Sequence, residues 1–131
     1  MNSREKGKRG ERDFRDFCRD MGFTARRGQQ FAGGVDSPDV IVEELPFVHL
    51  EVKFSEQAVI GSAYLEKAWE QATRDADGKK TPIVAFRRKR QAWMLMAEDR
   101  HQGVRCIVYR PQDMRETLER ANRIKQPPEA A

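Results

Sequence analysis

The residues best suited to chemistry stand in two apolar segments, Ser37–Val42 and Val48–Lys53, with a proline between them. Both segments are predicted to be strands, because apolar residues dominate them and a proline suits the turn that separates them. If the two strands form an antiparallel hairpin, Asp39 faces Glu51 with their Cα atoms about 4.5–5.5 Å apart. Lys53 then shares this face, since side chains alternate along a strand. The hairpin therefore predicts two carboxylates and an ammonium group side by side.

Such a group on one strand face is unfavourable unless it holds a cation or takes part in a reaction. Carboxylate oxygens are the ligands that Mg²⁺ and Mn²⁺ prefer. A metal held by Asp39 and Glu51 would activate a water molecule, orient a phosphate and stabilise the leaving oxygen. Lys53 would add a positive charge beside the attacking water or the phosphoryl oxygens. His49 falls on the same face, but we expect it to be structural and assign it no role.

Positive charge is concentrated in two stretches, although the net charge is only +4. Residues 79–90 contain basic side chains and no acidic one, and residues 4–9 contain four basic side chains against a single acid, Glu5. A solvated surface would explain either cluster alone, whereas two clusters on a small domain favour contact with a phosphate backbone. The glutamines of the loop at 28–37 can bond phosphates without adding charge. The predicted DNA-binding residues are Lys6, Lys8, Arg9, Arg26, Arg27, Gln29, Gln30, Arg87, Arg88, Lys89 and Arg90.

The elements that position these residues follow from apolar periodicity and from turn-forming residues. The predicted helices span 4–21, 62–77 and 112–125. The predicted strands span 23–27, 37–42, 48–53, 81–86, 92–96 and 104–109. Gly7 and Gly10 weaken the first helix, so its ordered part is expected to begin near Gly10. The order α-β-β-β-α-β-β-β-α, with a hairpin of 81–86 and 92–96, predicts an α/β (α+β) domain whose central mixed sheet is flanked by helices.

Length and composition limit the class of protein. The chain of 131 residues is 38% hydrophobic and 35% charged, which fits one globular domain at 1–125 followed by a flexible tail at 126–131. No apolar run approaches the ~20 residues that span a bilayer, and no signal peptide is evident, so we expect a cytoplasmic protein. Cys18 and Cys106 are interpreted as buried free thiols, and no Cys/His cluster suggests zinc.

Several short motifs make the chain resemble the PD-(D/E)XK nuclease superfamily, and especially the Holliday-junction-resolvase-like endonucleases of bacteriophages and prophages. The resemblance covers residues 6–90. The motifs are Gly10-Glu11-Arg12, Gly22-Phe23, Arg26-Arg27, Pro38-Asp39 and Glu51-Val52-Lys53.

The resemblance implies a restriction-endonuclease-like fold and a metal-dependent DNA endonuclease. Asp39 and Glu51 match the metal ligands, with the Val52 carbonyl as a third. Glu11, which alone would be interpreted as a first-turn acid favoured by the helix dipole, matches a helix glutamate that completes the metal site. Lys53 matches the catalytic lysine, and Gln71 matches a glutamine on the following helix.

The resemblance also implies Mg²⁺ as cofactor, with Mn²⁺ able to substitute, and branched or four-way DNA as substrate. It implies a homodimer in the cytoplasm of a bacterial or phage-infected cell, for which residues 54–62 and 104–109 are candidate contacts. Other hypotheses remain open at this point. They are a nuclease for flaps, nicks or linear duplex, a non-catalytic DNA-binding module of the same fold, and an acidic structural cluster in an RNA-associated protein.

Overall fold

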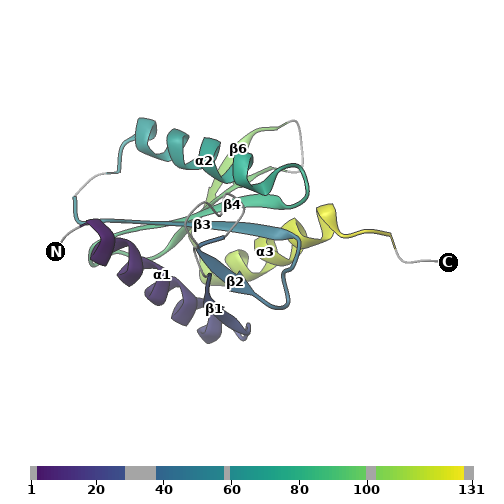
Figure 1. The fold of residues 1–131 in the computed structure, drawn as a ribbon, viewed down its shortest axis with the longest axis horizontal. Helices are drawn as coiled ribbons and strands as arrows, with labels where there is room; N and C mark the ends of the chain where they lie inside the picture. The colour runs from purple at the N-terminus through teal and green to yellow at the C-terminus, as the bar shows by residue number, and fades with distance from the viewer. Residues whose placement is uncertain (1–2, 29–37, 58–59, 100–102, 129–131) are drawn as a thin grey trace.

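The computed structural model describes residues 3–28, 38–57, 60–99 and 103–128. The predicted order of elements and the predicted class, α/β (α+β) with a mixed sheet, are both confirmed (Figure 1). The elements are α1 (Ser3–Asp20), β1 (Ala25–Arg27), β2 (Val40–Val42), β3 (Val48–Ser55), α2 (Ser62–Ala76), β4 (Thr81–Arg88), β5 (Met94–Glu98), β6 (Arg105–Val108) and α3 (Pro111–Lys125).

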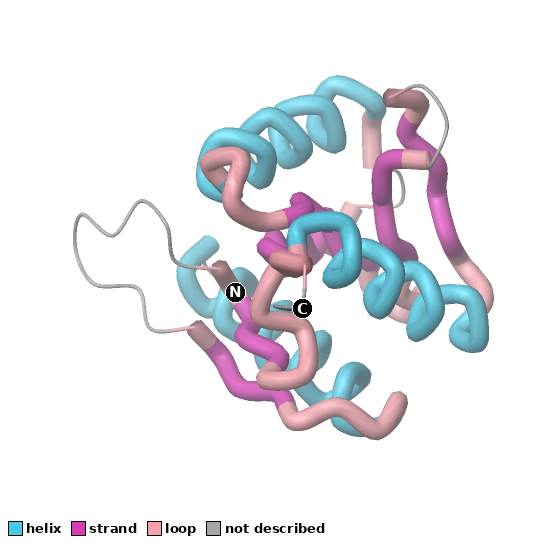
Figure 2. The backbone as a smooth tube through the Cα atoms, turned by 90° about the vertical axis from the view of Figure 1, so that its right-hand side faces the viewer, coloured by secondary structure: helices cyan, strands magenta, loops and turns pink. Residues whose placement is uncertain are grey.

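Four strands form the central sheet in the order β3-β4-β5-β6. β3 and β4 are parallel, and the other two pairs are antiparallel, as the predicted hairpin of 81–86 and 92–96 required. Parallel neighbours need a crossover, which α2 supplies. β1 and β2 form a separate antiparallel pair that lies against α1 (Figure 2). β3 is therefore an edge strand of the central sheet.

Helices cover both faces of the sheet, with α2 above β3 and β4 and α1 below them in Figure 1. One hydrophobic cluster joins α1 and α3 to the sheet through residues such as Phe14, Leu50 and Leu118. A second cluster joins α2 to β4 and β5. Because side chains alternate along β3, Leu50 packs in the first cluster while Glu51 and Lys53 point toward α2.

Helix α1 begins at Ser3, so the expectation that order starts near Gly10 is wrong. The reason is packing between α1 and β3. Gly10 is buried, and a Cβ added to it would lie 2.8 Å from Cβ of Phe54. The glycine lets the helix approach the strand closely, and this contact outweighs a helix propensity about 1 kcal/mol poorer than that of alanine.

The predicted antiparallel hairpin of 37–42 and 48–53 is also wrong. β2 pairs with β1, placing Val42 opposite Ala25, and β3 pairs in parallel with β4. The chain does reverse direction between them, through bonds from Leu45 N to Val42 O and from Val48 N to Leu45 O. β3 is buried along most of its length, and such burial on both faces is typical of a strand in a parallel sheet. The apolar run at 48–53 was therefore a signal for parallel pairing, which the hairpin prediction misread.

Three further predictions concern the C-terminal tail, the two cysteines and membrane-spanning segments. α3 ends at Lys125, while residues 129–131 of the predicted tail lie outside the described residues. Both thiols are free, as predicted, but only Cys18 is buried, whereas Cys106 is partly exposed. Within the described ranges, no helix has both the length and the apolar composition needed to cross a bilayer.

Candidate active site

One pocket gathers all six residues that the sequence placed in the metal and catalytic site. Its volume is about 380 Å³. It lies where α1, the segment before β2, the edge strand β3 and α2 meet. Residues that are far apart in the chain thus line the same pocket. The six are Glu11, Asp39, Glu51, Val52, Lys53 and Gln71.

Asp39 reaches the pocket by bonding to the free edge of β3. Its backbone N–H donates to Leu50 O at 3.0 Å, and its Oδ2 accepts from Val52 N–H at 2.8 Å. The carboxylate therefore occupies a place that a further strand would otherwise fill. Since the N–H and C=O groups of one strand residue point to the same edge, the Val52 carbonyl also points to this edge of β3. The carboxylates of Asp39 and Glu51 thus come to line the same pocket, although the two residues are not paired across a hairpin as predicted.

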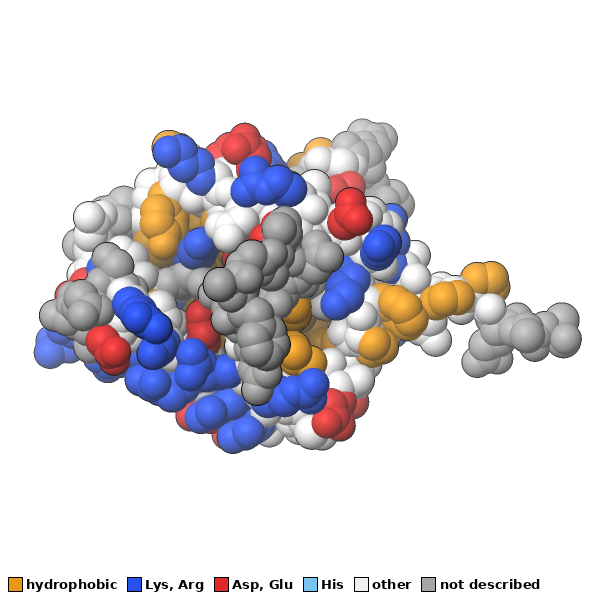
Figure 3. All heavy atoms as spheres, viewed as in Figure 1, with side chains coloured by type: hydrophobic (Ala, Val, Ile, Leu, Met, Phe, Trp, Pro, Cys, Tyr) orange, Lys and Arg blue, Asp and Glu red, His pale blue; other side chains and the backbone are white. Residues whose placement is uncertain are grey.

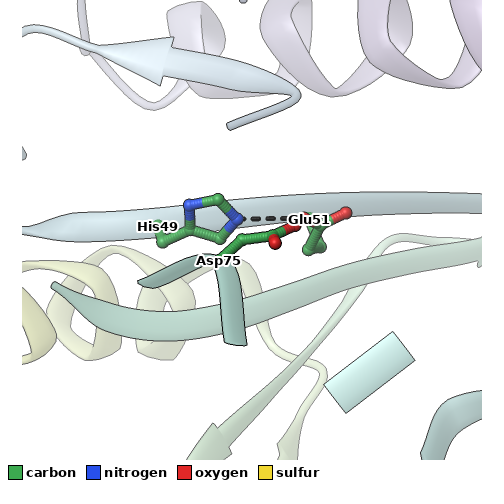
Figure 4. Close-up of side chains that lie close together, drawn as sticks. All are labelled: His49, Glu51 and Asp75. Carbon is green, nitrogen blue, oxygen red and sulfur yellow. Dashed lines mark hydrogen bonds and ion pairs between the residues drawn. The ribbon is translucent and has the colours of Figure 1, made fainter. Parts of the chain in front are cut away.

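Glu51 is buried on β3, with only 2% of its surface exposed. Its Oε1 lies 2.9 Å from Nε2 of His49, which is fully buried two residues earlier on the same strand. A carboxylate oxygen of Asp75, from α2, lies within 4.8 Å of both partners (Figure 4). Glu51 thus lies between the pocket and the side chains of His49 and Asp75.

Glu11 enters the pocket from α1 and is held by an arginine. Nε of Arg27 donates to Oε1 of Glu11 at 3.2 Å, and the side chain of Glu11 is only 16% exposed. This contact ties β1 to α1 at the rim of the pocket. The guanidinium of Arg27, which the sequence assigned to DNA, is thus engaged within the protein.

Lys53 and Gln71 meet across the pocket. The ammonium group of Lys53 donates to Oε1 of Gln71 at 3.3 Å, which links β3 to α2. The amide fixes the lysine without a negative charge, so the ammonium remains uncompensated by this partner. It can therefore act on an anionic group that enters the pocket.

Burial and mutual repulsion perturb the acids. Burial and then the charge of Glu51 raise the pKa of Asp39 to about 8, against the opposing bond from the Val52 N–H. Burial raises the pKa of Glu11 as well, and the bond from Arg27 only partly offsets it. A divalent cation would relieve this repulsion. Three carboxylates and a backbone carbonyl form the oxygen donor set that such a hard cation prefers.

Basic side chains surround this pocket. Lys6 lines it, and the guanidinium of Arg9 lies 5.7 Å from the centre of the Phe54 ring at the end of β3. The turn between β4 and β5 lies beside the same strand end, where Lys89 N donates to Ser55 O at 2.8 Å. Figure 3 shows Lys and Arg side chains gathered over α1 and β1. An anionic polymer could therefore approach the pocket along α1.

Arg87 differs from the rest of the predicted DNA-binding set. Its guanidinium lies between the rings of Phe54 and Trp93, 5.3 and 4.9 Å from their centres, and pairs with Asp13. A side chain held in this way supports the packing of α1 on the sheet. We therefore remove Arg87 from the proposed DNA-binding surface.

The other predicted DNA-binding residues vary in exposure. Arg26 is exposed and lies 3.6 Å from Glu43. Lys89 and Arg90 are exposed at the β4–β5 turn, and Arg88 and Lys8 are half-buried. Gln29 and Gln30 lie outside the described residues.

Sequence reasoning missed the roles that His49 and Asp75 could have behind Glu51. A signal was present for His49, which precedes Glu51 by two residues and so shares its strand face. Asp75 follows Gln71 by four residues and so lies on the same helix face. Neither signal was decisive, because the proximity of α2 to β3 depends on tertiary packing.

The pocket combines acids that could hold a cation with a lysine beside them, and basic side chains lie outside it. This arrangement could support metal-assisted cleavage of phosphate esters. Residues 2–125 match the family described as "Phage putative PDDEXK endonuclease". The chain belongs to this family, which confirms the resemblance to the PD-(D/E)XK superfamily.

Comparisons with curated proteins and with solved structures add less information about this chain. No curated protein matches the chain. Among solved structures, it is similar to that of Archaeoglobus fulgidus Hjc, a Holliday junction resolvase from an archaeal hyperthermophile. The identity is 19%, the match covers 75% of this chain and 85% of that chain, and the TM-score is 0.48.

Proposed function

We propose that the protein is a divalent-metal-dependent DNA endonuclease that hydrolyses phosphodiester bonds and prefers branched DNA such as a four-way junction. Mg²⁺ is the proposed cofactor, with Mn²⁺ able to substitute, and the bacterial or phage-infected cytoplasm is the proposed compartment. One observation carries this proposal: Glu11 from α1, Asp39 from the segment before β2, and Glu51 and Lys53 from β3 line one pocket. A protein that only binds DNA has little use for buried acids facing phosphate.

The metal-binding part of the proposed mechanism uses oxygen atoms only. The carboxylates of Glu11, Asp39 and Glu51 and the carbonyl of Val52 would hold the cation. When bound, such a cation polarises the phosphate and makes a water molecule more acidic. The hydrogen bond from Val52 N–H to Asp39 holds the Asp39 carboxylate beside β3. The hydrogen bond from Arg27 holds the Glu11 carboxylate at the rim of the pocket.

Lys53 supplies the second part of the proposed mechanism. Its ammonium, held by Gln71, would stabilise the negative charge that develops on the phosphoryl oxygens. Because Gln71 is neutral, it can orient the lysine without reducing that charge. The proposed DNA path runs from the start of α1 across the pocket to the β4–β5 turn. It includes Lys6, Lys8, Arg9, Arg26, Arg88, Lys89 and Arg90.

A homodimer is the proposed assembly, since symmetric cutting of a four-way junction needs two active sites. The exposed Ile107 and Tyr109 support contact through residues 104–109, on and next to the edge strand β6. The other candidate contact, 54–62, includes residues 58–59, which lie outside the described part. Light scattering that finds only monomers at the concentrations used for cleavage would contradict this assembly.

The test is cleavage of a four-way junction and of a linear duplex of equal length, with Mg²⁺ or with chelator. Asp39→Asn should abolish cutting while keeping DNA binding. Asp77→Asn is a matched control, because Asp77 is exposed, follows α2 outside the pocket, and has a left-handed backbone that asparagine also tolerates. It should cut like the wild type.

Each outcome discriminates between hypotheses. Cutting that survives chelation, or that Asp39→Asn leaves unchanged, would contradict the metal site. Equal cutting of both substrates would contradict junction selectivity but leave the nuclease intact. Binding without cutting under all conditions would favour the DNA-binding module.

A further inference from the structure

His49 has an environment that core packing does not explain. The side chain is fully buried, with Nε2 2.9 Å from Oε1 of Glu51. Its other ring nitrogen, Nδ1, is buried and has no hydrogen-bond partner among the described residues. Leaving a buried polar atom unpaired costs about 1–3 kcal/mol, and an apolar residue at this position would avoid that cost. The presence of an imidazole at this position is therefore not explained by its contribution to the stability of the fold.

The same unpaired atom indicates the direction of the bond to Glu51. A proton on Nδ1 would be a buried donor without an acceptor, whereas a bare Nδ1 is only an unused lone pair. The favoured tautomer thus carries its proton on Nε2. In this tautomer His49 donates its Nε2 proton to Oε1 of Glu51.

The position of Glu51 gives this bond a consequence at the pocket. Its carboxylate touches His49 behind the pocket and also lines the pocket itself. Figure 4 shows the ring of His49 directed along β3 toward that carboxylate, with Asp75 beside both. Fixing one oxygen from behind restricts rotation of the carboxylate. It orients the group for a ligand on the other side, as hydrogen-bond partners of metal ligands commonly do.

We propose that His49 is a positioning residue for the metal site, which donates a hydrogen bond to Glu51 and so holds its carboxylate ready for a divalent cation. The inference rests on the proposed function, because it takes Glu51 as a metal ligand. His49 itself touches neither DNA nor metal in this proposal. Its effect should therefore appear in metal affinity rather than in DNA affinity.

The test compares two substitutions at His49. His49→Leu removes the donor, whereas His49→Gln keeps an N–H donor at the end of a side chain of similar reach. We would measure Mn²⁺ binding to the DNA-free protein by electron paramagnetic resonance titration. His49→Leu should weaken Mn²⁺ binding by about 10–100-fold, and His49→Gln should recover most of this loss. Junction binding in chelator should stay unchanged in both, and excess Mn²⁺ should restore cutting by His49→Leu.

The outcomes separate this inference from the proposed function. If His49→Leu keeps its thermal midpoint and its Mn²⁺ affinity while Asp39→Asn loses Mn²⁺ binding, the role of His49 is overturned and the metal site stands. If His49→Gln binds Mn²⁺ as weakly as His49→Leu, the hydrogen bond is not the cause. If the wild type binds no Mn²⁺, both proposals fall. Should His49→Leu not fold, His49→Met provides a flexible apolar side chain for the same comparison.

Discussion

Acidic side chains in the pocket destabilise one another when no cation is present. Asp39 bonds to the edge of β3, yet burial and the charge of Glu51 still raise its pKa. The pKa of Glu11 is raised in the same direction by its own burial. A site suited to a cation therefore carries a cost in the metal-free protein. That cost should be measurable as a dependence of stability on pH.

The metal-free protein should lose stability as pH rises. The pKa of Asp39 is raised from 3.8 in the unfolded chain to about 8 in the folded protein. Between these values the folded state holds a proton that the unfolded chain has released, so the free energy of unfolding falls with pH. This stabilisation is complete below 3.8 and is lost as pH passes about 8. Urea unfolding in chelator across this window would measure the slope.

Two controls isolate the carboxylate. Asp39→Asn cannot titrate and should show a flatter dependence on pH than the wild type. Saturating Mg²⁺ should raise wild-type stability most at the alkaline end, because the cation binds the ionised acids. Parallel curves for wild type and Asp39→Asn would mean that Asp39 does not titrate abnormally.

Helix α1 and strand β3 position the acids relative to one another through a close contact at Gly10. Gly10→Ala should destabilise the protein, although alanine is the better helix former. The new Cβ would meet Cβ of Phe54 at 2.8 Å, and neither atom sits on a flexible chain end. Overpacking of this kind costs about 1–3 kcal/mol. Because Glu11 is the next residue, the shift of α1 should also lower Mn²⁺ affinity.

Gly7→Ala is the matched control on the same helix. A Cβ at Gly7 would meet nothing within 4 Å, so only helix propensity changes. This variant should gain up to about 1 kcal/mol. Chemical denaturation of both variants measures the difference, and equal stabilisation by the two alanines would contradict the packing role of Gly10.

The elements were predictable to the extent that their signals are local. Periodicity located the helices and strands and their order, including the β4–β5 hairpin. The partners of β2 and β3 were not predictable in this way, because strand pairing depends on segments distant in sequence. Asp39 and Glu51 converge although the expected hairpin is absent, since a side chain capping a strand edge can replace a cross-strand pair.

Charge along the chain predicted where basic residues gather but not which ones face solvent. Arg87 belongs to the basic run at 79–90, yet it packs between Phe54 and Trp93 and pairs with Asp13. Its guanidinium is used as a flat, stacked group, a property that sequence charge does not reveal. His49 was undervalued for a related reason, because its partner Glu51 lies in a buried environment that only the assembled layers create.

The exposed end of the β4–β5 turn provides the test of the DNA path as a whole. Lys89 and Arg90 are exposed there, beside the end of β3 that carries pocket residues. Replacing both by alanine should weaken junction binding and reduce the slope of log K against log salt by about 0.9 for each phosphate that is no longer neutralised. Cutting at saturating DNA should be retained, because neither side chain lines the pocket.

The matched control removes the same charge elsewhere. Arg123 and Lys125 are exposed in the last turn of α3, and neither lines the pocket. Replacing this pair by alanine lowers the net charge equally but should leave the salt slope unchanged. If both double variants reduce the slope alike, general electrostatic attraction holds the DNA and the turn makes no specific contact. A reduced slope for the Lys89 and Arg90 variant alone would assign phosphate contacts to the turn beside β3.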